Sequence, residues 1–303
     1  MNRFVIGALC TLAGAVLWGF SGAGIQLLQS DYGVQPLFIT TMRMLGAGTL
    51  MLAALAITRR EALARMLYDR ATLVRLAVFG CVGLFACQLT YIVVIRYTNA
   101  GTSTALQGLN VVFIVMATCL MTRKLPNRYE IAGMCTAFAG TVLIATKGDL
   151  STLVIPRPGL VWGVISAASV AFYTMYPKRL FEQWGSVPVT GFGMLAGGVM
   201  SLVLFAAGGM AGMPPELPAL DGFGVLILAC VVLFGTVGAF GLFLHGVSIV
   251  GSVKGSQLGA IEPVSATLFS WLWLGMVFSW GDWAGLALMV ATVFLVTLQA
   301  RLR

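Results

Sequence analysis

The sequence predicts an all-α membrane protein with ten transmembrane helices, arranged as two inverted five-helix repeats. Of its 303 residues, 59% are hydrophobic and only 9% are charged, whereas soluble domains carry about 25% charged residues. The apolar stretches run to roughly 20 residues, enough to cross a membrane as a helix, and they lack the alternation of a barrel strand. The third observation is an internal repeat with a period of 152 residues.

The repeat aligns without a gap over most of the chain. Identical residues brought into register by a shift of 152 include the pairs Gly7 and Gly159, Ala15 and Ala167, Gly33 and Gly185, Pro36 and Pro188, and Gly83 and Gly235. Each copy, residues 1–151 and 152–303, holds five apolar segments. Because five is an odd number, the second copy enters the membrane from the opposite side, an architecture found in many secondary transporters.

Apolar runs between turn signals define the predicted helices in order. The first run is too long for a signal peptide and has no convincing cleavage site, so we interpret it as the first span. Turn residues separate several of the runs, at 30–33, 125–127, 156–159 and 213–216. The ten helices are expected near residues 4–28, 35–57, 73–96, 100–121, 128–146, 159–181, 188–209, 223–247, 252–275 and 281–299.

Lysine and arginine are distributed unequally between the two sides of this arrangement. Between the predicted helices, one side has only Lys147 and Arg157. The other side collects Arg3, Arg59, Arg60, Arg65, Arg70, Arg75, Arg123, Lys124, Arg128, Lys178, Arg179, Arg301 and Arg303. Because basic loops remain in the cytoplasm, both termini are expected to be cytoplasmic, in a cell (inner) membrane. Topology thus explains most of the net charge of +8 without a nucleic-acid partner.

Glu262 is the only acidic residue expected deep inside a span. It lies about ten residues into its helix, near the bilayer midplane. An ionisable group at that depth costs about 3 kcal/mol and is a functional candidate, here for proton coupling. Gly251, Gly255 and Gly259 recur every four residues on the same face, which allows close approach of another helix. The alternative is that Glu262 is neutral or ion-paired and only fixes helix packing.

Other polar residues are expected at the same depth. The repeat matches Glu262 with Asn110, and Gln107 shares the helix face of Asn110. Gln88 and Tyr91 have the same relationship in the helix near 73–96. Their amide and phenol groups both donate and accept hydrogen bonds. Each residue alone could form a packing bond between helices, whereas the set predicts a substrate cavity.

Arg43, Trp18, Tyr173 and His245 are weaker candidates. Arg43, about seven residues into its helix, could hold a substrate carboxylate, pair with Glu262 or cap carbonyl groups. Trp18 and Tyr173 lie midway along helices that the repeat makes equivalent, where they could stack on a substrate ring or pack between helices. His245 is a second proton-coupling candidate, with an interfacial position as the alternative. Lys254 is expected to extend toward the inner interface.

The sequence contains no pattern that indicates catalysis. It has one histidine, no zinc-protease or nucleophile-elbow motif, no P-loop and no soluble nucleotide-binding domain. Its six cysteines lie in apolar segments, and none has metal-ligand spacing. We therefore expect neither an enzyme nor a cofactor or metal site.

Several short features in order resemble the EamA-type branch of the drug/metabolite transporter superfamily. They are Arg43 after Pro36, Gly285, and the segments Trp18-Gly19, Asn99-Ala100-Gly101 and Glu262-Pro263. The resemblance covers nearly the whole chain and implies a substrate path between the two halves, with small metabolites as cargo. The chain departs from the family at Lys124 and Met276, near positions where an acidic residue often stands.

These observations predict a secondary transporter that moves a small organic metabolite, such as an amino acid or an amine, by alternating access. Export is the expected direction. The partners are the small-molecule substrate and the lipid bilayer, and a homodimer is left open. The alternative is a membrane scaffold or lipid-handling protein that does not transport a solute.

Overall fold

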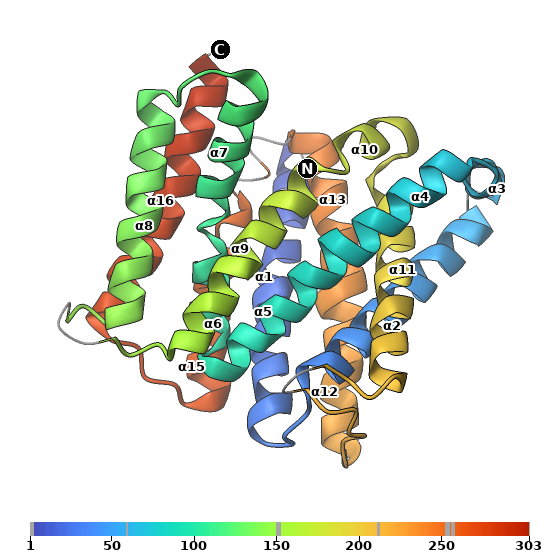
Figure 1. Ribbon diagram of the computed structural model, residues 1–303, viewed down its shortest axis with the longest axis horizontal. Coiled ribbons are helices and arrows are strands. Elements are labelled where there is room, and N and C mark those ends of the chain that lie inside the picture. The colour runs from blue at the N-terminus through green and yellow to red at the C-terminus, as the bar shows by residue number, and fades with distance from the viewer. Residues whose placement is uncertain are drawn as a thin grey trace.

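The protein is a bundle of long helices (Figure 1). The computed structural model describes residues 3–58, 60–149, 153–210, 213–251, 255 and 258–302, and these contain no β-strand. The all-α class predicted from the sequence is confirmed.

The first half of the chain forms α1 (Arg3–Ser30), α2 (Pro36–Thr58), α3 (Arg60–Tyr68), α4 (Arg70–Val78), the π-helical turn η1 (Phe79–Leu84), α5 (Phe85–Tyr97), α6 (Ala100–Gln107), α7 (Asn110–Thr122) and α8 (Arg128–Thr146). The second half forms α9 (Arg157–Met175), α10 (Lys178–Trp184), α11 (Ser186–Ala206), α12 (Gly222–Val232), the π-helical turn η2 (Leu233–Gly238), α13 (Ala239–Val250), α15 (Glu262–Leu274) and α16 (Trp280–Leu302).

Eight helical spans in the described residues are long and apolar enough to cross a membrane, and they correspond to the first eight predicted segments. The described part of the ninth segment contains the 13-residue helix α15. The tenth contains a shorter apolar stretch, Trp280–Leu295. A protein of ten spans therefore remains a prediction.

Two helix interruptions were not anticipated from the sequence. The span Ala100–Thr122 is broken by a turn at residues 108–109. There the hydrogen bonds from Gly108 N to Ala105 O and from Leu109 N to Leu106 O follow an i to i−3 pattern rather than the i to i−4 pattern of an α-helix. A second turn, at residues 260–261, precedes α15. The two turns differ by 152 positions, so they occur at the same place in the repeat.

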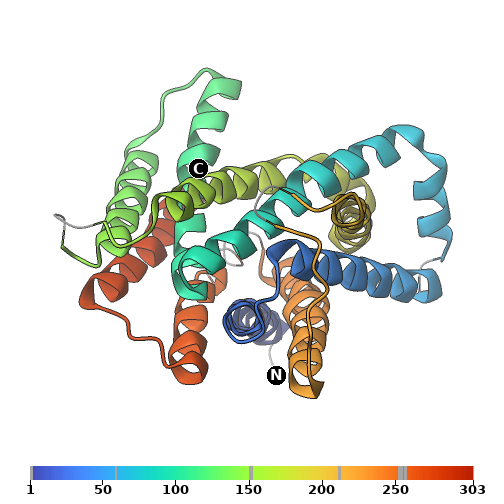
Figure 2. The ribbon, with the colours of Figure 1, turned by 60° about the horizontal axis from the view of Figure 1, so that its bottom comes forward.

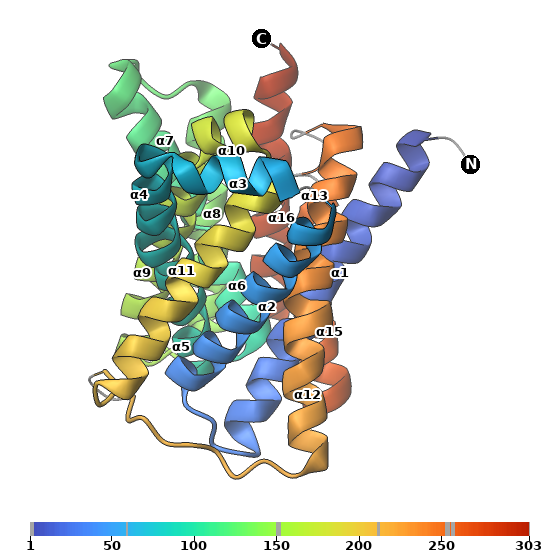
Figure 3. The same cartoon turned by 90° about the vertical axis from the view of Figure 1, so that its right-hand side faces the viewer.

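Helices from the two halves of the chain pack against each other. α1 contacts α13 and α15, and α5 contacts α9. The other main pairs are α2 with α11 and α8 with α16. α8 and α16 lie together at one edge of the molecule (Figure 2). The start of α1 and the end of α16 lie at the same end of the bundle, here called the termini side (Figures 1 and 3). The opposite end, with the last turn of α1 and the start of α6, is called the far side.

Glycine residues bring helix backbones into direct contact. A Cβ atom added to Gly80 in η1 would collide with the carbonyl oxygen of Gly193 in α11. Gly241 in α13 has open space around the same position. We expect Gly80→Ala to lower the free energy of unfolding by about 1–3 kcal/mol, as overpacking does. Gly241→Ala, the matched control, should be neutral or stabilising in thermal unfolding of the purified protein. Equal unfolding temperatures for the two variants would contradict this packing.

A capping contact on the far side predicts a pH dependence of stability. Asp221 caps α12 by accepting hydrogen bonds from Gly224 N and Tyr32 Oη, both at 2.7 Å. These bonds hold the pKa of Asp221 below its usual value. The stabilisation is therefore present at neutral pH, above the pKa of an unfolded aspartate, and is lost as acid titrates the folded carboxylate. Asp221→Asn keeps the cap but cannot titrate. We expect its unfolding temperature to fall less between pH 7 and pH 3 than that of the parent. An identical fall in the two proteins would show that Asp221 does not contribute to the pH dependence of stability.

Candidate functional site

A cavity of about 350 Å³ lies between the two halves of the chain. Its wall combines residues from α1, α2, α5, α6, α7, α9, α13, α15 and α16. All eight residues predicted from the sequence to bind substrate line this one cavity: Trp18, Arg43, Gln88, Tyr91, Gln107, Asn110, Tyr173 and Glu262.

The helix interruptions border the cavity. Asn110 is the first residue of α7, and Glu262 is the first residue of α15. Both side chains line the cavity and are partly exposed. Pro263, the next residue of α15, has no backbone N–H group, and its ring fits the first turn of a helix. In many secondary transporters the substrate site is formed by discontinuous helices at the interface of two repeats.

Arg43 is almost completely buried, with 3% of its surface exposed. Its Nε donates to Thr236 Oγ1 at 3.2 Å, and its Nη1 donates to Gln88 Oε1 at 3.3 Å. Thr236 Oγ1 in turn donates to the carbonyl oxygen of Val231, within the helical rod that contains η2. The guanidinium group therefore connects α2 to α5 and to η2 at the edge of the cavity.

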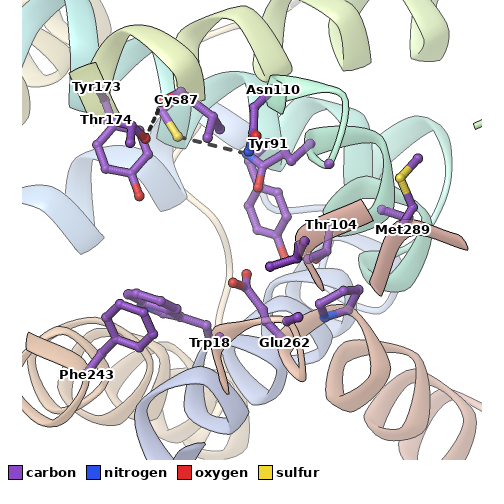
Figure 4. Close-up of a pocket in the computed structure, with 18 of the residues that line it drawn as sticks. Trp18, Cys87, Tyr91, Thr104, Asn110, Tyr173, Thr174, Phe243, Glu262 and Met289 are labelled. Carbon is purple, nitrogen blue, oxygen red and sulfur yellow. Dashed lines mark hydrogen bonds between the residues drawn. The ribbon is translucent and has the colours of Figure 1, made fainter. Parts of the chain in front are cut away.

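Glu262 and Arg43 carry opposite charges in the same cavity, but they form no ion pair in the described structure, since Arg43 donates its hydrogen bonds to Thr236 and Gln88. Figure 4 shows the Glu262 carboxylate pointing into the open space between Trp18 and Tyr91. The alternative considered above, in which Glu262 is paired with Arg43, is therefore not observed in the described structure. A carboxylate in this position is available to a ligand.

Two other polar residues of the cavity, Tyr91 and Gln107, are held by interhelical hydrogen bonds. Tyr91 Oη lies 3.2 Å from Thr104 Oγ1 in α6. Gln107 Nε2 donates to Ser166 Oγ in α9 at 2.9 Å and approaches Cys87 Sγ at 3.9 Å. These bonds fix the orientation of groups that also line the cavity, so the packing role and the cavity role coexist in the same residues.

Aromatic rings form another part of the wall. Trp18 packs against Phe240 and Phe243 of α13, with ring centroids 5.0 and 4.7 Å apart. Tyr173 of α9 also points into the cavity (Figure 4). The arrangement offers an apolar, polarisable surface near a carboxylate, which suits a cation or an aromatic group.

The structure does not bring His245 into this cavity. His245 is exposed on α13, and the cavity residues of that helix are Phe240 and Phe243. Lys254 lies outside the described residues. The described residues contain no group of three or more metal-binding side chains that could hold an ion.

Sequence reasoning missed several residues of the site. Thr236 and Ser166 anchor Arg43 and Gln107, but single hydroxyl residues in apolar helices usually bond to their own helix and give no signal. Phe240 and Phe243 are two of 18 phenylalanines in the chain, and nothing in their spacing marks them. Thr104 could have been found, because it lies three residues before Gln107 on the same helix face.

Comparison with known proteins identifies the family and the fold of the chain. A model of the EamA-like transporter family matches the chain twice, over residues 5–146 and 157–298. A Salmonella typhimurium protein described as an uncharacterized inner membrane transporter, YicL, is 35% identical over 297 residues, which cover 98% of this chain and 97% of the relative. The uncharacterized transporter YwfM of Bacillus subtilis is 24% identical, with 97% and 94% coverage. A solved crystal structure with 19% identity has a TM-score of 0.67 over 97% of both chains, which supports the fold alone.

Proposed function

The chain belongs to the EamA-like transporter family, and from this we propose that it exports a small organic metabolite across the cytoplasmic membrane by alternating access. The observation that carries the proposal is the cavity between the two helix interruptions. Its volume of about 350 Å³ falls in the range of small-molecule sites, roughly 300–1,000 Å³. The protein is a multi-pass membrane protein, and the bilayer is its environment.

The charges of the cavity favour an amino acid or an amine as cargo. The Glu262 carboxylate faces the open space and suits an ammonium group. Arg43 lies at the cavity edge, where its guanidinium group suits a carboxylate. The rings of Trp18 and Phe243 offer a surface for an apolar side chain. A zwitterion could thus satisfy both charges, whereas a simple amine would use only Glu262.

Two matched features support an inverted repeat. The family model matches both halves of the chain separately. The helix interruptions, with Asn110 and Glu262 beside them, stand at equivalent positions of the two copies. Five spans per copy would then make ten, and opposite orientations of the copies would allow the cavity to open to either side in turn.

The orientation with cytoplasmic termini is supported by exposed basic residues on the termini side. Arg60 and Arg65 on α3, and Lys178 and Arg179 on α10, are exposed there (Figure 3). The cavity wall continues toward this side to Ile114, Thr174 and Val293. We therefore propose that the described conformation takes up its cargo from the cytoplasm. Glu262 would carry the coupled proton if a proton gradient drives export.

The function is tested by a thermal-stabilisation screen of the purified protein against amino acids, amines and nucleosides. A compound that binds only the folded state raises the unfolding temperature, and at a given concentration a tighter ligand raises it more. We expect stabilisation by at least one amine or zwitterion, with no effect in a Glu262→Gln variant. Stabilisation by nucleosides alone would contradict the proposed recognition.

A non-transporting scaffold or lipid-handling protein is the second candidate. Cysteine accessibility separates the two. We expect a water-soluble thiol reagent to modify Asn110→Cys rapidly in the intact membrane, because Asn110 is partly exposed to the cavity. Gln88→Cys should react more slowly, since only 9% of Gln88 is exposed. Unreactive thiols at both positions would favour the scaffold.

A further inference from the structure

The far side of the cavity is closed by tightly packed helices. Residues 21–28 of α1 and 100–106 of α6 are all buried. A Cβ atom added to Gly22 in α1 would strike Tyr91 Oη, and one added to Gly101 in α6 would strike Thr267 in α15. Since Tyr91 lines the cavity, these contacts begin directly behind its wall. A solute can leave by this side only if α6 and α15 move away from α1.

One side chain bonds to both of these helices. Gln26 lies on α1, one turn beyond Gly22, and is 8% exposed. Its Oε1 accepts a hydrogen bond from Ala100 N at 2.9 Å and another from Ser270 Oγ at 3.1 Å. Ala100 is the first residue of α6, so its N–H has no partner within the helix. Ser270 lies on α15. A single oxygen atom thus joins the far-side parts of the two interrupted helices.

We propose that Gln26 is a gating residue of the transport cycle, which keeps the far side of the cavity closed by bonding α6 and α15 at the same time. The proposal rests on the proposed transport function. Opening toward the far side separates these helices from α1 and breaks both hydrogen bonds, so the Gln26 side chain sets the balance between the two conformations.

The repeat indicates that the pair of hydrogen bonds accepted by Gln26 is present in one copy only. The position equivalent to Gln26 is Lys178, and the position equivalent to Ser270 is Thr118. A lysine ammonium group donates hydrogen bonds but cannot accept them. Lys178 and Thr118 are both exposed on the termini side. The second copy therefore has no such acceptor at the equivalent position, which favours the conformation open to the termini side.

The native Cys87 is a suitable reporter, because it is the one cysteine among the described residues that line the cavity. In a variant with the other five cysteines replaced, a membrane-impermeant maleimide is applied to sealed vesicles from either face. The parent should react from the termini side and only slowly from the far side. Gln26→Leu should raise the far-side rate about tenfold, equivalent to a shift of about 1.4 kcal/mol.

Three variants serve as comparisons. Ser270→Ala removes one of the two bonds without altering α1, so its far-side rate should lie between those of the parent and Gln26→Leu. Gln26→Glu keeps an acceptor for both bonds at a helix N-terminus and should restore the slow rate. Gln29→Leu is the matched control, because Gln29 Nε2 bonds only to Ile92 O of α5 at 3.1 Å and does not bridge α6 and α15.

An unchanged far-side rate in both Gln26→Leu and Ser270→Ala, with normal reaction from the termini side, would overturn the role of Gln26 and leave the proposed transport function standing. A Gln29→Leu variant as reactive as Gln26→Leu would also overturn it, because general loosening of α1 would then explain the effect. Failure of Cys87 to react from either face would reject the accessible cavity, and with it both proposals.

Discussion

Replacing Glu262 with glutamine is expected to lower transport about 100-fold, the loss that corresponds to a hydrogen bond between charged groups. The variant should also lose any dependence of transport on a pH gradient. Glu262 is the acidic residue that points into the cavity, and the described Arg43 bonds do not engage its carboxylate. Glutamine keeps the size of the side chain but cannot attract an ammonium group or exchange a proton. The measurement is the initial rate of transport in proteoliposomes with and without an imposed pH gradient.

Glu216→Gln is the matched control for this experiment. Glu216 is an exposed acidic residue in the segment between α11 and α12, away from the cavity residues. Its replacement removes the same charge and should leave transport unchanged. If Glu262→Gln transports at the parent rate with the same pH-gradient dependence, Glu262 serves only helix packing.

Replacing Arg43 with methionine is expected to weaken binding of a zwitterion about 10- to 100-fold, while binding of the corresponding amine changes little. The difference arises because only the zwitterion has a carboxylate for Arg43. Arg43→Lys should not restore affinity, because one ammonium group cannot replace a fork that bonds Thr236 and Gln88 together. Ligand-induced shifts of the unfolding temperature give both affinities.

Arg43→Met should also destabilise the protein, since Gln88 Oε1 and Thr236 Oγ1 lose their donor. Comparing the two ligands within the same variant separates this structural effect from recognition. Arg96→Met is the control, because Arg96 is exposed and bonds Gln35 near the far side. An equal loss of affinity for amine and zwitterion in Arg43→Met would mean that Arg43 only supports the fold.

The membrane spans could be predicted because hydropathy depends on composition, which is local. Eight predicted segments correspond to spans of the structure. The residues of the cavity could be predicted for a related reason, since a polar group deep in a span is costly and must face protein or water. Glu262, Asn110 and Arg43 stand out by this criterion alone.

The helix interruptions could not be predicted with the same ease. Gly108 stands in a run that is otherwise compatible with a helix, and glycine is common in membrane helices. Pro263 marks the first turn of α15, but a proline within a membrane span can equally kink a continuous helix. The breaks depend on packing against other helices, which a single segment does not encode.

The position of His245 illustrates another limit. Apart from His245 and Ser248, α13 consists of apolar residues and glycine, so hydropathy alone does not distinguish the face toward the cavity from the face toward lipid. His245 is exposed, whereas Phe240 and Phe243 face the cavity. Only the packing of α13 against α1 determines which residues of the helix meet the substrate path.

The central claim, that the cavity between the two helix interruptions carries a solute across the membrane, is tested most directly by counterflow. Proteoliposomes are loaded with a compound found in the stabilisation screen, and the entry of its labelled form is followed. Saturable exchange that depends on Glu262 and is slowed at least tenfold by a bulky Asn110→Leu replacement is the predicted result. The claim would be contradicted if the reconstituted protein bound the compound as tightly as the purified protein does but showed no exchange above that of empty liposomes.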